Sequence, residues 1–351
     1  MKADIITLLR QRGTYVSGQE LCERYGVSRT AVWKAMEQLK KDGYQIEAVK
    51  NRGYLLREDA RGVFGRTEIE SRRKSKWVGQ TLVFYDQTDS TNMQAKRLAE
   101  EGAPDGTVVV ADCQSAGRGR RGRAWTSPPG TNLYFTLLLR PRITPDKASM
   151  LTLVMALAVA KGIHKTLQPC VQCQAKDTAG KPASEKHGAD ATAVGIKWPN
   201  DIVIDGRKVC GILTELSLSV EQDCIDYLVI GTGINVARQS FPEELAGHAI
   251  SLEEIYGSVN RSELLANVLE AFEEVYGQFL RTQSLEYLRP AYDALLVSKD
   301  KSVRVLDPKG EYDGIARGIQ NTGELIVELP DGSVKNVYAG EVSVRGIYGY
   351  V

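Results

Sequence analysis

The most informative stretch of the sequence is Gly117-Arg118-Gly119-Arg120-Arg121-Gly122-Arg123-Ala124-Trp125, which sets four arginines and three glycines ahead of a tryptophan. Fixed positive charges on a glycine-rich backbone repel one another, so we expect this loop to become ordered around an anion. The planar guanidinium group matches a phosphate or a carboxylate through two hydrogen bonds. The stretch therefore predicts a small polyanionic ligand held beneath a loop.

The same stretch satisfies the GxGxxG pattern of a dinucleotide-binding turn, and a strand is expected just before it at 107–112. That turn must open a helix whose N-terminus binds the pyrophosphate. Here the chain continues as Trp125-Thr126-Ser127-Pro128-Pro129-Gly130, and the prolines exclude a helix. A Walker lysine motif is also absent from the sequence. We infer that the arginine side chains, rather than a helix dipole, supply the positive charge.

Composition limits the class of protein. The 351 residues predict two or three domains, and a net charge of +1 gives no global indication of a nucleic-acid partner. No apolar run is expected to reach the ~20 residues of a membrane helix, and the N-terminus has no signal-peptide pattern. The six cysteines are scattered and predict reduced thiols. We therefore expect a cytoplasmic protein without a membrane partner.

Residues 1–60 have the pattern of a winged helix-turn-helix: short helices, a tight turn and a basic hairpin. Ser17 with Glu20 forms an expected capping box, and Ser28 caps the third helix. The alternative is a small helical interaction domain with a solvated charged face. The DNA-binding interpretation assigns contacts to the third helix and the wing tip, at Ser28, Arg29, Thr30, Trp33, Lys34, Lys50 and Arg52.

Residues 67–295 predict one α/β domain around a mixed sheet, with helices at 91–101, 147–167 and 261–282. Residues 58–66 are a predicted linker, and the basic run 72–76 a solvated face. The polar segment 168–192 reads as a surface insertion. Its Cys170 and Cys173 lack a second cysteine pair, which favours free thiols over zinc. Residues 299–351 predict an SH3-like β-barrel with a hairpin turn at Asp331-Gly332.

Several motifs resemble those of the biotin–protein ligases. The segment from Gln114 to Trp125 looks like the family's biotinyl-adenylate loop, and Lys197-Trp198-Pro199-Asn200-Asp201 matches its second signature. Three further segments are similar to other family motifs, namely Ser90-Thr91-Asn92, 207–213 and 231–235. The resemblance covers most of the chain, and it implies a central domain like the class II synthetases. The N-terminal pattern is similar to bifunctional members, which also repress transcription.

The resemblance implies an activity and a set of site residues. The family joins biotin to ATP as biotinyl-5′-AMP, with Mg²⁺ sharing the phosphate charge, and transfers biotin to a lysine of a carrier protein. Arg120 and Lys197 are the implied catalytic residues. The implied biotin contacts are Ser90, Thr91, Asn92, Gln114, Gly117, Arg118, Gly119, Arg120, Lys197, Gly211, Gly231 and Gly233. The implied ATP contacts are Arg118, Arg120, Arg121, Arg123, Trp125, Asn200, Asn235 and Arg317; no metal ligand is assigned to the protein.

In bifunctional members the adenylate favours a homodimer that binds a two-fold operator, and this is the first hypothesis here. A second hypothesis is a ligand-sensing DNA-binding protein without ligase activity. The arginine loop and Lys197 argue against it, because sensing needs no phosphate-transfer site. A third is a lipoate ligase, against which the arginine loop and the front domain favour biotin.

Overall fold

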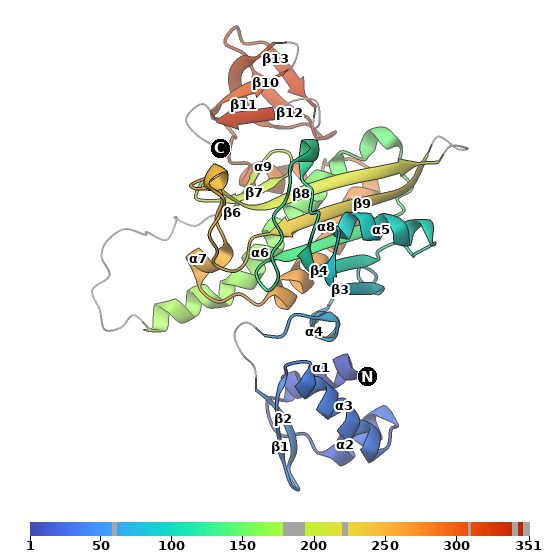
Figure 1. The fold of residues 1–351 in the computed structure, drawn as a ribbon. Helices are drawn as coiled ribbons and strands as arrows, with labels where there is room; N and C mark the ends of the chain where they lie inside the picture. Colours follow the sequence, from blue (N-terminus) through green and yellow to red (C-terminus); the bar gives the residue numbers. More distant parts are fainter. Residues whose placement is uncertain (58–61, 178–193, 220–223, 308–309, 339–342, 347–351) are drawn as a thin grey trace.

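Strand pairing in the computed structural model separates three sheets along the chain, of two, seven and five strands. The structure describes residues 1–57, 62–177, 194–219, 224–307, 310–338 and 343–346. Figure 1 shows the N-terminal helices at one end, the large sheet in the middle and the C-terminal strands at the other end. This arrangement confirms the expected α/β class with a helical front domain and a β-domain behind.

The N-terminal unit consists of three helices and a hairpin: α1 (Lys2–Arg12), α2 (Gly18–Tyr25), α3 (Arg29–Lys41), β1 (Gln45–Val49) and β2 (Gly53–Arg57). Both expected serine caps are present, because Ser17 Oγ accepts from Glu20 N at 3.1 Å and Ser28 Oγ accepts from Ala31 N at 3.2 Å. The other predicted contact of the capping box, from the Glu20 carboxylate back to the Ser17 backbone, is wrong. The Glu20 carboxylate instead accepts from Arg12 Nη2 at 2.8 Å, so an ion pair replaces the backbone contact.

A short helix that the sequence did not predict, α4 (Arg66–Arg72), follows the linker. It corrects the view of the 72–76 run as a wholly solvated face. The Arg72 side chain is only 13% exposed and pairs with Glu68, whereas Lys74 and Lys76 are exposed. A basic run thus conceals one arginine that belongs to a buried contact, because the helix directs it inward.

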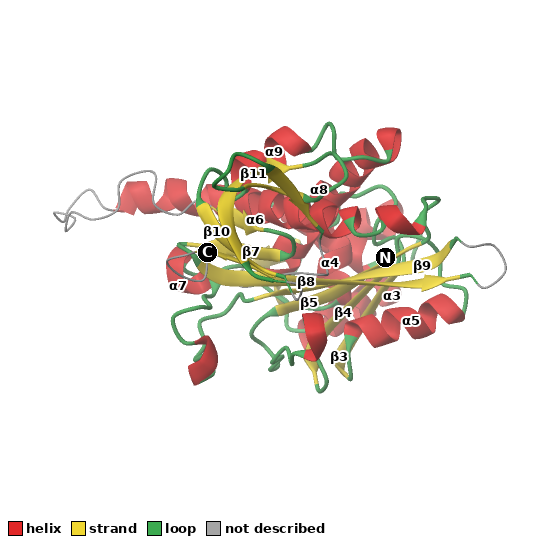
Figure 2. Ribbon diagram, turned by 90° about the horizontal axis from the view of Figure 1, so that it is seen from above, coloured by secondary structure: helices red, strands yellow, loops and turns green. Residues whose placement is uncertain are grey.

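The central sheet has the order β3-β4-β5-β9-β8-β7-β6, and only β3 and β4 run parallel among these neighbours. Helices α6 (Met150–Asp177) and α8 (Arg261–Thr282) pack against each other on one face, and α5 (Thr91–Glu100) covers β4, β5 and β9 on the other (Figure 2). The strand bounds are β3 Leu82–Thr88, β4 Val108–Gln114, β5 Leu133–Leu139, β6 Val194–Lys197, β7 Asp201–Ile204, β8 Arg207–Leu218 and β9 Ile225–Ile234.

Helix α6 (Met150–Asp177) is longer than the expected 147–167 and continues through the first part of the predicted insertion. Residues 178–193, and the side chains of Cys170 and Cys173, lie outside the described residues.

The expectation of no apolar run of membrane length is wrong. The stretch Pro145–Leu167 is long and apolar enough to span a membrane, but 78% of its most apolar window is buried within the protein. It is the core helix beneath the sheet.

The C-terminal unit is a five-stranded antiparallel sheet in the order β13-β12-β11-β10-β14. Its strands are β10 Ser302–Leu306, β11 Tyr312–Ile319, β12 Leu325–Glu328, β13 Val334–Val337 and β14 Ser343–Gly346, and short helices α7 (Leu252–Tyr256) and α9 (Arg289–Leu295) precede it. Pairing among the described strands leaves the sheet open between β13 and β14. Trp198 Nε1 donates to Gly323 O at 3.0 Å, which ties the sheet to the central domain.

Candidate functional site

Motifs distant in the sequence form one row across the central sheet. Lys197 pairs with Asp201, Asp201 with Gly211, Gly211 with Gly233, and Gly233 with Tyr134. Directly paired residues project to the same face of a sheet. The row therefore brings the segments around 197–201, 207–213 and 231–235 to one place.

A cavity lies beside this row, between the sheet, the start of α5 and the arginine stretch. Most of the predicted site residues line it, together with four that were not predicted. The lining is Ser90, Thr91, Asn92, Gln114, Arg118, Gly119, Arg120, Trp125, Asn200, Lys208, Gly211, Ile212, Leu213, Gly231, Thr232 and Gly233.

The arginine stretch is a folded-back hairpin rather than an open loop. Gly119 N donates to Arg123 O at 2.7 Å, and Trp125 N donates to Gly117 O at 2.9 Å. A single helical turn, η1 (Arg120–Gly122), forms its tip and holds Arg121 in the left-handed region. Backbone pairing thus shapes the stretch, while the side chains of Arg118, Arg121 and Arg123 are exposed and that of Arg120 is half-buried.

Trp125 sits against two of the predicted glycines. A Cβ at Gly233 would meet its Nε1 at 2.6 Å, and one at Gly211 would meet its ring at 2.9 Å. Both positions must therefore be glycine for the indole to lie there. Nε1 is buried without a hydrogen-bond partner, and Lys208 Nζ lies 5.5 Å from the ring centroid. The indole ring of Trp125 thus fills the space beside these two glycines.

A polar network joins the arginine hairpin to the segment after the cis peptide bond Trp198–Pro199. Arg120 Nη1 donates to Asn200 Oδ1 at 2.8 Å, and Asn200 Nδ2 donates to Asp201 Oδ1 at 3.0 Å. Lys208 Nζ pairs with the same carboxylate oxygen at 2.6 Å. Burial lowers the pKa of the Arg120 guanidinium, against the opposing field of Asp201, yet an arginine stays charged at neutral pH. Arg120 is therefore a desolvated cation bound to a neutral amide.

The floor of the cavity is polar and ordered. Gln114 Oε1 accepts from Thr91 N at 2.9 Å and from Thr91 Oγ1 at 3.1 Å, and Gln114 Nε2 donates to Ser127 Oγ at 2.9 Å. Asn92 fills the space above Gly231, where a Cβ would lie 2.1 Å from Asn92 Oδ1. These groups suit a neutral, polar ligand ring more than a second anion.

Six predicted site residues do not line the cavity. Gly117 lies at the base of the hairpin and Arg123 beyond its tip, while Arg121 lines a neighbouring cavity with Pro145 and Thr152. Lys197 ends β6, half-buried, and Asn235 is buried, with its backbone paired to Val209 and Leu252. Arg317 is in the C-terminal sheet, where it pairs with Asp300 at 2.9 Å and Glu328 at 2.8 Å.

Some contributors were missed by sequence reasoning. Lys208 lies within the 207–213 motif, but it was assigned no role. The alternation of side chains along β8 places Glu215 on the same face as Gly211. Thr136 on β5 and Ser127, just after the hairpin, contact lining residues, and Lys96 on α5 contacts Glu215. Only their partners in space reveal them, because each comes from a different element.

Two of the predicted DNA-contacting residues, Arg29 and Lys50, line one groove of the N-terminal unit. The start of α3 and the β1–β2 turn border this groove. Trp33 is 56% exposed, unusual for a tryptophan with no ligand. Arg29 Nη2 donates to Gln19 Oε1 at 2.9 Å, and the Arg52 guanidinium lies 4.5 Å from the Tyr15 ring centroid.

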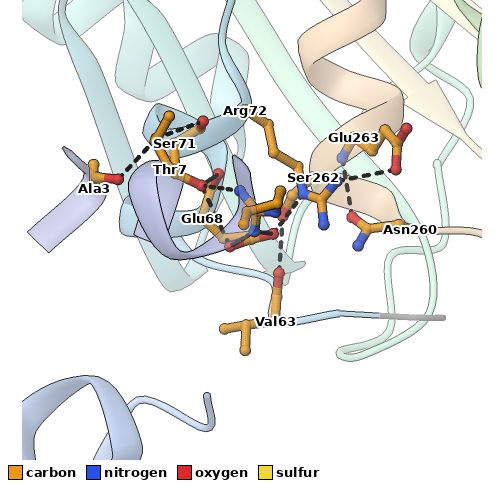
Figure 3. Close-up of polar contacts among 10 residues, drawn as sticks. Ala3, Thr7, Val63, Glu68, Ser71, Arg72, Asn260, Ser262 and Glu263 are labelled. Atoms are coloured by element: carbon orange, nitrogen blue, oxygen red, sulfur yellow. Dashed lines mark hydrogen bonds and ion pairs between the residues drawn. The ribbon is translucent and has the colours of Figure 1, made fainter. Parts of the chain in front are cut away.

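A cluster of charged residues joins the N-terminal unit to the rest; we call it the joint, formed by Arg10, Glu68, Arg72 and Glu263. Arg10 Nη2 contacts both Glu68 oxygens, at 2.7 and 3.0 Å, and Arg72 bridges from Glu68 to Glu263 at 3.1 Å. Figure 3 shows Glu68, Arg72 and Glu263 with Thr7, whose Oγ1 donates to Ser71 O at 3.0 Å. Glu68 is only 2% exposed.

Comparison with known proteins gives a consistent result along the chain. Family models described as the biotin/lipoate A/B protein ligase family, an HTH domain and the biotin protein ligase C terminal domain match residues 84–235, 2–55 and 300–345. The chain is 36% identical to the bifunctional ligase/repressor BirA of Bacillus spizizenii over 98% of both proteins. It is 30% identical to that of Escherichia coli over 97% of this chain and 96% of the relative.

Solved structures agree. A biotin protein ligase from Aquifex aeolicus in complex with biotin and ATP superposes with a TM-score of 0.61 at 30% identity, covering 76% of this chain and 99% of that one.

Proposed function

This chain belongs to the biotin protein ligase family, and from that membership we propose how its cavity and its N-terminal unit divide two tasks. The protein is a bifunctional ligase and repressor: it joins biotin to ATP as biotinyl-5′-AMP and transfers biotin to a lysine of a carrier protein. The site assignment rests on one observation: Arg118 and Arg120 line the same cavity as the polar residues Ser90, Thr91 and Gln114.

In the first step an oxygen of the biotin carboxylate attacks the α-phosphorus of ATP and pyrophosphate leaves. Two anions must approach, so fixed cations at the meeting point lower the barrier. Arg120 suits this role because it is desolvated and is held by an amide that does not neutralise its charge. Arg118 is exposed over the same cavity and can follow the anion.

Lys208 is a third cation facing the cavity, together with Arg118 and Arg120. It pairs with Asp201, which leaves it free to exchange that carboxylate for a phosphate. Lys197 lies in the same sheet row and remains assigned to the reacting oxygens. Arg121, Arg123, Asn235 and Arg317 remain proposed ATP contacts. They reach the nucleotide only if it extends beyond the cavity.

In the second step the ε-amine of the acceptor lysine attacks the biotinyl carbonyl and AMP leaves. The nucleophile belongs to the partner, so this chain supplies position and charge rather than a base. We propose that Mg²⁺ arrives with the ATP phosphates and shares their negative charge. Within the part of the chain that the structure describes, no group of three or more His, Cys, Asp or Glu side chains could hold a metal.

The repressor function uses the N-terminal unit, with α3 in a DNA groove and the β1–β2 turn beside it. We assign DNA contacts to the exposed α3 residues and to Lys50 and Arg52, and we place the protein in the cytoplasm, with its operator. Two such units bind a two-fold operator when the adenylate favours a homodimer.

The test of the ligase is transfer of biotin to a carrier domain, followed by mass spectrometry. We expect labelling of one lysine only when both biotin and ATP are present. Labelling without ATP, or a preference for lipoate over biotin, would contradict the assignment.

The test of the repressor is a gel shift against the chain's own upstream region. Binding should require biotin with ATP and should disappear when residues 1–60 are deleted. Equal binding with and without both substrates would remove the proposed coupling.

A further inference from the structure

A chain of hydrogen bonds runs beneath the cavity from Glu215 to Gln114. Glu215 Oε2 accepts from Asn92 Nδ2 at 2.7 Å, and Asn92 Oδ1 accepts from Thr136 Oγ1 at 2.6 Å. Thr136 Oγ1 lies 2.8 Å from Thr91 Oγ1, which lies 3.1 Å from Gln114 Oε1. We call this chain the relay. Three of its five members, Asn92, Thr91 and Gln114, line the cavity.

Glu215 is placed at the end of the relay by the alternation of β8, which directs Gly211, Leu213 and Glu215 to the same face. Its other oxygen pairs with Lys96 Nζ at 2.6 Å. Lys96 and Asn92 are four residues apart on α5, so both project from one side of the helix toward Glu215. Burial opposes ionisation of Glu215, but hydrogen bonds from Lys96 and Asn92 outweigh it and lower its pKa.

An ionised carboxylate can only accept hydrogen bonds, and this gives the relay a direction. The amide nitrogen of Asn92 must face Glu215, so its oxygen faces Thr136. The single hydroxyl hydrogen of Thr136 is then committed to Asn92. Thr91 also has a single hydroxyl hydrogen, and it can reach either Thr136 Oγ1 or Gln114 Oε1, so in both cases it is used within the relay.

The direction determines what the cavity presents to a ligand. Asn92 Oδ1, above Gly231, presents a lone pair because Glu215 holds the amide nitrogen on the other side, and Thr91 Oγ1 presents one because its hydrogen is used within the relay. The ureido ring of biotin carries two N–H donors. Resting on the function proposed above, we propose that Glu215, held by Lys96, is a positioning residue that fixes Asn92 Oδ1 as an acceptor and so sets specificity for the ureido ring.

Glu215→Gln tests the direction without changing shape. Lys96 can donate only to the amide oxygen at position 215, so the amide nitrogen must face Asn92. Asn92 then turns over and presents an N–H donor above Gly231. A donor facing a donor leaves a buried group unpaired, so the KM for biotin should rise about 10- to 100-fold. The KM for ATP and kcat at saturating biotin should change by less than about threefold.

The decisive variant is Glu215→Gln combined with Lys96→Met. Without the ammonium, the amide at position 215 can rotate its oxygen toward Asn92 and restore the original direction. The double variant should therefore bind biotin at least about fivefold better than Glu215→Gln alone. If the pair served only to stabilise the fold, the second substitution would add to the damage.

The matched control is Glu270→Gln, which neutralises the exposed Lys165–Glu270 pair of 2.7 Å on the other side of the sheet. It should leave the KM for biotin unchanged. A Glu215→Gln variant within twofold of the wild type, or a double variant no better than the single one, would overturn the proposal. A wild-type chain that fails to label a carrier with biotin overturns the proposed function itself, and with it this inference.

Discussion

Arginines gather at two places in this molecule, the hairpin at 117–125 and the joint, and the two are built differently. In the joint, Arg10 and Arg72 each contact the carboxylate of Glu68, and Arg72 also contacts Glu263. In the hairpin, Arg120 contacts a neutral amide, and no described carboxylate lies within ion-pair distance of Arg118 or Arg123. The joint has its own anions, whereas the hairpin lacks enough of them to balance its charge.

These partners separate an arginine cluster that holds the fold together from one that binds a ligand. A buried charge without a partner is costly, so a cluster that must persist in the folded protein supplies its own counter-charge. A cluster that binds an external anion must leave its charge available.

Arg120→Ala should reduce the rate of adenylate formation by roughly 10²–10³, because it removes one preorganised donor at the developing charge. Pyrophosphate release from biotin and ATP is the measurement, and the melting temperature should barely change. Arg66→Ala, which removes an exposed arginine paired with Glu70, serves as the control. An unimpaired Arg120→Ala variant would mean that the hairpin is not the anion site.

Biotin with ATP should protect the hairpin from trypsin. At a ligand concentration 100 times Kd, cleavage after Arg118, Arg121 or Arg123 should slow by about 100-fold, as binding adds about 2.7 kcal/mol. Cleavage after the exposed Lys74 or Lys76, next to the joint, is the internal reference and should keep its rate. Equal protection at both places would erase the distinction between them.

Glu68→Gln should lower the free energy of unfolding by about 2 kcal/mol in urea. Breaking a fully buried ion pair costs roughly 3–5 kcal/mol. The expected loss here is smaller because the side chains of Arg10 and Arg72 are still 20% and 13% exposed. The labelling rate of the folded variant should stay within about twofold. The exposed-pair variant Glu270→Gln should cost less than about 1 kcal/mol. A large loss of labelling would show that the joint acts on the site.

Asp89 pairs with Arg97 at 2.7 Å beside the cavity, in the manner of the joint but exposed. The Arg97 guanidinium, with backbone and hydroxyl donors, lowers the pKa of Asp89 to about 2. A lowered pKa means that the pair stabilises the fold above about pH 4 and loses that effect as the pH falls toward 2. Carboxyl NMR titration should show this pKa, and Arg97→Gln should raise it. An unchanged pKa would assign the shift to the backbone and hydroxyl donors of Ser90 and Thr88.

Much of this architecture was readable in the sequence. Ser17 and Ser28 predicted the starts of two helices, because a serine cap is a local hydrogen bond. The prolines at 128 and 129 excluded a helix after the hairpin, which is also a local constraint. In contrast, α4 was missed because its seven residues are held by distant partners on α1 and α8 rather than by their own periodicity.

The sequence by itself determined which segments carry chemistry, because arginine, glycine and the Lys197–Asp201 signature impose their character wherever they fold. It could not decide which cations face the cavity. Sheet register placed Lys208 there and left Arg317 in its own ion pairs. Only the tertiary structure shows that Glu215 contacts Asn92 and Lys96 and so forms the end of the relay. The direction of these hydrogen bonds depends on contacts between side chains of α5, β5 and β8. No local sequence pattern predicts such contacts, because the three elements are far apart in the chain.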